Sequence, residues 1–233
     1  MMIRMDEHPD ESEYEDTFSL ERVFLSAALF EVSLGALALF LGWLIGPDPR
    51  ASLPQINQWA AVADIAQPVL KSCGWGILAA VPMLLVISVI RRLPFESVRE
   101  LERLGDTPTM KTLLSLGPAE MVVISLCAGI GEELLFRGWL MSAILNVYKL
   151  QPGIAPDAIA PVVVAIGLSA ILFGLVHWIT HLYAVLATLM GVYFGWLFYA
   201  TGDLLVPIIA HAAYDAVQFL YGAWADSKAA AKD

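Results

Sequence analysis

Charged residues are scarce in this sequence, and positively charged residues are the scarcer kind. Only 15% of the 233 residues are charged, and 13 Lys and Arg stand against 23 Asp and Glu, which gives a net charge of -10 at pH 7. Such a chain lacks the basic surface that nucleic-acid binding requires, so we expect no nucleic-acid partner. Part of the acidity lies at the N-terminus, where residues 1–21 are predicted to form a disordered, solvated tail.

Cysteine is nearly absent, and two familiar sequence signals are missing. Cys73 and Cys127 are the two cysteines, and both fall in apolar segments without CxxC spacing, which argues against a disulfide framework. No HExxH motif occurs, so the chain is not a zincin of that type. The first twenty residues lack the basic and apolar regions of a secretory signal, so we expect the first apolar span to remain in the mature protein.

Apolar residues dominate what is present. They make up 58% of the chain, and the mean hydropathy is +0.69. Several apolar runs have the length of about 17–25 residues that a membrane-spanning helix needs. The fold class that this pattern predicts is all-α, a polytopic transmembrane helical bundle with about six spans. The predicted spans are Val23–Gly46, Cys73–Ile90, Pro118–Tyr148, Pro161–Trp178, Leu182–Ala200 and Leu205–Trp224.

The distribution of basic residues predicts the orientation of these spans. Five of them fall in the short loop after the second span, at Arg91, Arg92, Arg99, Arg103 and Lys111. Cytoplasmic loops collect Lys and Arg, so this loop is predicted to be cytoplasmic. Counting spans outward from it puts both termini in the cytoplasm. We therefore expect an integral membrane protein, most simply of a bacterial plasma membrane, with residues 22–115 forming a two-span region that ends in the basic loop.

The third predicted span carries three ionisable residues, Glu132, Glu133 and Arg137. A charged side chain near the centre of a membrane helix costs about 2.5–3.5 kcal/mol on insertion scales, so each of these residues needs a partner. Glu133 and Arg137 are four residues apart and are predicted to pair on one helix face. Glu132 points about 100° away and is free to meet another helix. This helix is longer than a bilayer core, so we expect it to tilt, protrude or bend, and a bend is expected at Gly129 and Gly131.

Two later spans supply candidate partners for Glu132. Phe173 and His177 are four residues apart, which sets an aromatic ring beside an imidazole, and His211 and Asp215 repeat the spacing. Counting residues from Glu132 to the end of its span, and back down the next span to His177, puts both at one depth. Between His177 and His211 the chain makes one full pass across the membrane and returns, so His211 can lie at the depth of His177. Glu132, His177 and His211 are therefore predicted to converge.

A carboxylate near two imidazoles supports hydrolysis in two ways, and the spacing leaves both open. Glu132 can act as a general base on water while the imidazoles bind the developing oxyanion. Alternatively, His177, His211 and Glu132 can hold a zinc ion that acidifies its bound water. Glu31 interrupts the first span, and we interpret it as a structural polar contact within the bundle.

Taken together, the three polar pairs resemble the motifs of a known family. The order Glu132-Glu133-x-x-x-Arg137, Phe173-x-x-x-His177 and His211-x-x-x-Asp215 is similar to that of the CPBP intramembrane proteases. This family includes the type 2 CAAX prenyl endopeptidases and bacterial Abi proteins, and the resemblance covers roughly Pro118–Gly222. It implies a helical membrane core of eight or fewer helices with a water-accessible cavity, and a four-helix protease core within residues 116–225.

The resemblance also implies roles for the six residues. Glu132 would activate water with help from His177, Glu133 and Arg137 would shape the site, and His211 with Asp215 would stabilise the oxyanion or contribute to a metal site. The eukaryotic CAAX enzymes carry Asn where this chain has Asp215. Because a carboxylate donates no hydrogen bond unless it is protonated, this difference favours orientation of His211 or metal binding by Asp215.

The function that we expect is therefore an intramembrane endopeptidase. Its partners would be membrane lipid and a peptide, prenylated protein or other membrane protein as substrate, and zinc assistance is left open. The alternative is a non-catalytic membrane scaffold or a transporter that uses the same polar cluster for binding.

Overall fold

The structure is a bundle of helices. The computed structural model describes residues 11–54, 62–149, 155 and 158–231. Within these residues no strand occurs, so the predicted all-α class is confirmed. The elements are α1 (Glu11–Ile45), α2 (Val62–Ile90), α3 (Glu96–Arg103), η1 (Leu104–Asp106), α4 (Pro108–Leu114), α5 (Pro118–Glu133), η2 (Leu134–Met141), α6 (Ser142–Lys149), α7 (Ile159–Val176), α8 (His181–Thr201) and α9 (Leu205–Ala230).

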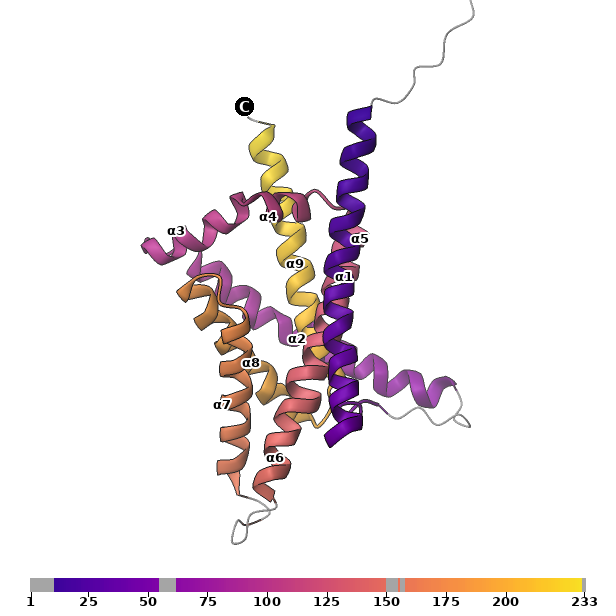
Figure 1. Cartoon of the computed structure of the whole chain (residues 1–233). Helices are drawn as coiled ribbons and strands as arrows, with labels where there is room; N and C mark the ends of the chain where they lie inside the picture. The colour runs from indigo at the N-terminus through magenta and orange to yellow at the C-terminus, as the bar shows by residue number, and fades with distance from the viewer. Residues whose placement is uncertain (1–10, 55–61, 150–154, 156–157, 232–233) are drawn as a thin grey trace, which may run out of the picture.

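Helix α5 lies at the centre of this arrangement. It packs against α1 on one side and α9 on the other, while α7 and α8 form an antiparallel pair that contacts η2 (Figure 1). Helix α2 crosses the bundle obliquely and packs against α9. The short helices α3 and α4 lie across one end, which also carries the start of α1 and the end of α9 (Figure 1).

The number of helices able to cross a membrane is lower than the predicted six. Four have the required length and apolar composition, over Leu20–Ile45, Asp64–Ile90, Ile159–Val176 and His181–Thr201. A fifth is counted if α4 and the long helix Pro118–Tyr148, which meet at 113°, form one broken span. The predicted sixth span, 205–224, forms the greater part of α9 but is not among them. Its sequence includes His211, Asp215 and Gln218, which lower its apolar character.

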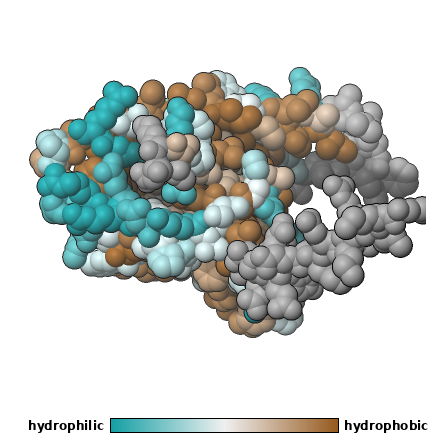
Figure 2. All heavy atoms as spheres, turned by 90° about the horizontal axis from the view of Figure 1, so that it is seen from above, coloured by the Kyte–Doolittle hydropathy of each residue, from teal (hydrophilic) through white to brown (hydrophobic). Residues whose placement is uncertain are grey.

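The outer surface of the bundle is strongly apolar. Large hydrophobic side chains are exposed on several helices, among them Leu29, Trp43, Leu85, Val163 and Leu189. Figure 2 views the molecule from the end that carries α3 and α4. Hydrophilic residues gather on the side of α3, while hydrophobic residues cover much of the remaining visible surface. An apolar surface around long apolar helices is what lipid contact requires.

Two sequence predictions about the N-terminal half need correction. Residues 11–21 of the predicted disordered tail form the first turns of α1, while residues 1–10 lie outside the described residues. The second span is longer than predicted, because α2 begins at Val62 and continues to Ile90 with Pro68 and Pro82 inside it. In both cases the helix extends beyond the apolar run that marks it in the sequence, and polar helix ends carry no such signal.

The glycines of α5 allow close packing instead of a bend. The chain remains α-helical through Gly129 and Gly131 to Glu133, and the departure from α-geometry comes only in η2. A Cβ at Gly129 would lie 2.7 Å from the carbonyl oxygen of Ile208 in α9. At Gly131 it would overlap the carbonyl oxygen of Glu31 in α1. The two glycines thus hold α1 and α9 close to α5, on either side of Glu132.

Gly131→Ala is expected to destabilise the folded protein by about 1–3 kcal/mol, because the added methyl forces α1 away from α5. The matched control is Gly167→Ala in α7, where an added Cβ meets no atom within 4 Å and the change is expected to cost nothing. Thermal unfolding in detergent measures both variants. Equal melting temperatures for Gly131→Ala and Gly167→Ala would show that α1 and α5 have room for a methyl group at Gly131.

Candidate active site

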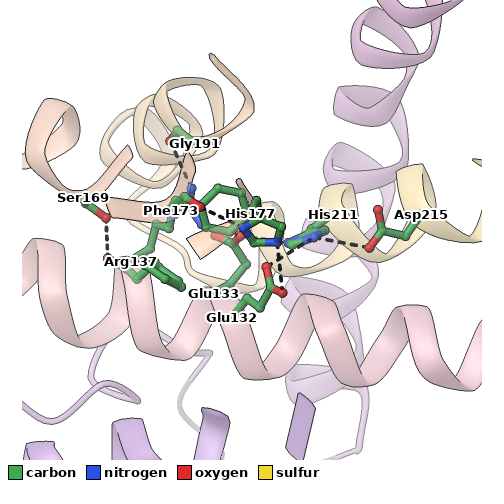
Figure 3. A network of polar contacts seen from close by, with 10 residues as sticks. Glu132, Glu133, Arg137, Ser169, Phe173, His177, Gly191, His211 and Asp215 are labelled. Carbon is green, nitrogen blue, oxygen red and sulfur yellow. Dashed lines mark hydrogen bonds and ion pairs between the residues drawn. The ribbon is translucent and has the colours of Figure 1, made fainter. Parts of the chain in front are cut away.

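The six predicted site residues come from four neighbouring elements. Glu132 and Glu133 end α5, Arg137 lies in η2, His177 caps the C-terminus of α7, and His211 and Asp215 lie in α9. The structure brings all six into one connected network (Figure 3). Their catalytic roles remain predictions.

Glu132 is the point on which the two imidazoles converge. Its Oε1 lies 3.5 Å from Nε2 of His177, and its Oε2 lies 3.8 Å from Nε2 of His211. Asp215 Oδ2 approaches the same Nε2 of His211 at 3.3 Å. The side chain of Glu132 is only 8% exposed, whereas those of His177 and Asp215 are 23% and 25% exposed. The network is therefore accessible from the side of His177 and Asp215.

The other ring nitrogen of each histidine is held by an acceptor. His177 Nδ1 lies 2.8 Å from the carbonyl oxygen of Phe173, and His211 Nδ1 lies 3.0 Å from Oε1 of Glu133. A carbonyl oxygen only accepts hydrogen bonds, so His177 donates from Nδ1. The carboxylate of Glu133 also accepts, so His211 donates to it from Nδ1. In the neutral form, each Nε2 then presents a lone pair toward Glu132. A lone pair facing a carboxylate is repulsive unless a proton or a water lies between them, so these atoms suit proton exchange with water.

Glu133 and Arg137 form the buried base of the site. Both side chains are fully buried, and Nη1 of Arg137 donates to Oε1 of Glu133 at 2.7 Å. This confirms the predicted i,i+4 contact. The guanidinium also donates from Nη2 to the carbonyl oxygen of Gly191 in α8 at 3.1 Å. Since Oε1 of Glu133 also accepts from His211, the pair connects α8 to α9 and fixes the His211 ring.

Aromatic rings enclose this buried charge. The guanidinium carbon of Arg137 lies 4.6 Å from the ring centre of Phe173 and 5.3 Å from that of Phe194, distances suited to cation–π attraction. Phe173 also lies 4.4 Å from the ring of His177, as its spacing predicts. Phe194 stacks on His211 at 4.9 Å. The rings exclude lipid and water from the Glu133–Arg137 pair and set the plane of each imidazole.

The π-helix η2 begins directly after Glu133 and shifts the register that carries Arg137. Such segments are rare and break the normal ladder of backbone hydrogen bonds. Here side-chain hydroxyls bond to two of its carbonyl oxygens. Ser169 of α7 donates to the oxygen of Phe136 at 2.8 Å, and Ser142 donates to that of Arg137 at 3.2 Å. These bonds satisfy polar backbone groups within an apolar bundle.

Two features of the site escaped prediction from sequence. The contact between Glu133 and His211 joins residues far apart in the chain, and no spacing rule reports it. Tyr183 of α8 is also close, since its ring centre lies 6.2 Å from that of His177 and it interacts electrostatically with Glu132 and Asp215. Its position near the start of a span is that of an ordinary interfacial tyrosine, so no pattern in the sequence singles it out.

The predicted zinc ligands do not form a recognisable metal site. Among the described residues, no group of three or more His, Cys, Asp or Glu side chains is placed to hold a metal ion. The Nε2 atoms of His177 and His211 lie 3.5 and 3.8 Å from the carboxylate oxygens of Glu132. Zinc binding by these three stays a prediction, and no catalytic step is derived through it.

Comparison with known families gives one match. Residues 115–217 match the family described as type II CAAX prenyl endopeptidase Rce1-like, and all six network residues lie within this segment. This match and the apolar helices identify an integral membrane protein. No curated protein and no solved structure matches the chain.

Arg137→Ala is expected to lower the free energy of unfolding by about 3–5 kcal/mol, because it leaves the Glu133 carboxylate buried without its cation. The control is Arg99→Ala, which removes an exposed ion pair with Glu96 and should have little effect. The free energy of unfolding of both variants is measured in a denaturing detergent, with circular dichroism as the signal. Similar losses in both would contradict a structural role for the buried pair.

Proposed function

We propose that this chain, whose residues 115–217 belong to the type II CAAX prenyl endopeptidase Rce1-like family, hydrolyses a peptide bond in a membrane-associated or lipidated substrate. The observation that carries the proposal is the approach of two histidine Nε2 atoms to the one carboxylate of Glu132, at 3.5 and 3.8 Å. The buried network behind them fixes both rings, so the reacting groups are preorganised.

The first step is attack by water. A water bound between the Glu132 carboxylate and Nε2 of His177 gives a proton to Glu132, and its oxygen adds to the substrate carbonyl carbon. The carbonyl π electrons move to oxygen and form a tetrahedral oxyanion. His177 keeps its orientation through the bond from Nδ1 to the Phe173 carbonyl oxygen, so the water is held on the side of Glu132.

The second step is collapse of this oxyanion. His211, protonated at Nε2, donates to the oxyanion, and its positive charge is balanced by Glu133 and Asp215 on its two ring nitrogens. The carbon–nitrogen bond breaks as Glu132 returns its proton to the leaving nitrogen. One water is consumed. The products are a carboxylic acid and an amine, and transfer of the acid proton to the amine gives a carboxylate and an ammonium group. Asp215 thereby acts by orienting His211 and maintaining its charge.

The substrate is proposed to carry a hydrophobic chain. A cavity of about 240 Å³ lies between α2, α8 and α9, and apolar side chains such as Met83, Val86 and Leu189 line it. Tyr214, next in sequence to Asp215, is the residue of α9 that lines it. A prenyl chain or another lipid anchor held there would bring an attached peptide to Glu132. We place the end with α3 and α4, and both chain termini, on the cytoplasmic side, as the basic loop predicts.

Glu132→Gln is expected to reduce kcat by about 10²–10⁴-fold, because the amide cannot take a proton from water. The matched control is Glu102→Gln in α3, which makes the same change at an exposed position outside the network and should retain activity. Cleavage of a prenylated peptide by each purified protein, read by mass spectrometry, measures the difference. Full activity in Glu132→Gln would remove Glu132 from the mechanism, and no cleavage by the wild type would favour a scaffold or transporter.

Chelation tests the alternative of zinc assistance. Since no step passes through a metal, cleavage is expected to survive treatment with a strong chelator, in protein whose metal content is measured in parallel. Stoichiometric zinc that is removed with loss of activity, and restores activity on return, would instead establish a metalloprotease with His177, His211 and Glu132 as ligands.

A further inference from the structure

Glu31 brings a further carboxyl group to the network from outside the matched segment. It lies in α1, and its backbone carbonyl oxygen packs directly against Gly131, the residue before Glu132. The close contact between α1 and α5 therefore fixes where the Glu31 side chain begins. Its carboxyl group interacts electrostatically with all four groups around the reacting centre, Glu132, His177, His211 and Asp215.

The Glu31 side chain has an unused hydrogen-bonding position. Its Oε2 is buried, and no hydrogen-bond partner for it is found among the described residues. A buried carboxyl oxygen without a donor is costly in an apolar bundle, so its retention beside the network calls for a donor that arrives during function.

Peptide hydrolysis supplies donors of the required kind. The substrate presents a peptide N–H at the scissile bond, and cleavage converts this nitrogen into an amine that becomes an ammonium group. The other groups near the reacting centre already have tasks, since Glu132 exchanges the proton of water, while Glu133 and Asp215 bind His211. A carboxylate forms a strong, charge-assisted hydrogen bond with an ammonium group.

We propose that Glu31 is a substrate-positioning residue, which binds the leaving-side nitrogen of the peptide and then the new amino terminus of the released fragment. This inference rests on the proposed endopeptidase function. It assigns α1 a direct part in substrate recognition, although α1 lies outside the segment that matches the protease family. The variant Glu31→Ala should still fold with the Glu132 network intact, because that network makes no hydrogen bond to Glu31.

The test compares the binding of two peptides that differ only at the amino terminus. The probes are the tripeptide Val-Ile-Met, which a CAAX-type cleavage would release, and its N-acetylated form, which lacks the ammonium charge. Binding to purified protein in detergent is measured by calorimetry and by inhibition of cleavage. The wild type is expected to prefer the free amine by about tenfold, the value of one hydrogen bond to a charged group.

In Glu31→Ala this preference is expected to fall to about one. Glu31→Gln, which keeps the shape but not the charge, should lie between the two and provides a second variant if Glu31→Ala folds poorly. The matched control is Glu21→Gln at an exposed position of the same helix, and it should keep the wild-type preference.

An unchanged preference in both Glu31 variants, or no preference in the wild type, would overturn the role of Glu31. Wild-type cleavage is measured separately, so the two claims can fail independently. A protein that cleaves but shows no dependence on Glu31 loses only this inference. A protein that cleaves nothing loses the proposed function.

Discussion

The buried ion pair between Glu133 and Arg137 is the interaction on which the rest of the site depends. Both side chains are fully buried in an apolar bundle, where an unpaired charge would be very costly. The pair therefore needs every contact that surrounds it, including the Gly191 carbonyl and the ring of Phe173. Because Glu133 also accepts from His211, satisfying the ion pair fixes an imidazole at the same time. The stability of the bundle and the geometry of the candidate site are thus coupled through one carboxylate.

Two glycines and a π-helix allow the helices around Glu132 to pack closely enough to form this site. Gly129 and Gly131 let α9 and α1 approach α5 on either side of Glu132, so groups from three helices reach one point. The π-helix after Glu133 then places Arg137 among the aromatic rings, and Ser169 from α7 bonds to one of its carbonyl oxygens. A π-helix leaves part of the normal ladder of backbone hydrogen bonds unmade, and side-chain hydroxyls bond to the carbonyl groups of Phe136 and Arg137 instead.

Much of this site follows from helical spacing alone, because residues four apart share a helix face. That rule gives the contacts of Glu133 with Arg137, Phe173 with His177 and His211 with Asp215, and depth counting brings the three segments together. What spacing does not give is the lateral packing of helices. The bond between Glu133 and His211 and the approach of Glu31 depend on which faces meet, and no alternation in the sequence records this.

The errors in the predicted fold have a related origin. Hydropathy marks the apolar part of a helix but not a polar end, so it does not predict the helix over residues 11–21. The predicted span 205–224 forms most of α9 but is not among the helices counted as apolar enough to cross a membrane, because α9 carries the polar His211 and Asp215. At Gly129 and Gly131, where the sequence predicts a bend, α5 stays α-helical. Glycine in a membrane helix can permit a bend or the close approach of another helix, and the sequence alone does not distinguish the two.

The most direct test of the account is a single-turnover cleavage of a prenylated peptide in ¹⁸O-labelled water, with enzyme in excess. If Glu132 activates water, the new carboxylate of the product carries one ¹⁸O atom and Glu132 carries none. If Glu132 instead attacks the substrate and its acyl intermediate is hydrolysed at the enzyme carboxyl, the product is unlabelled and the ¹⁸O appears in Glu132. The account predicts the first result, and the second would contradict it.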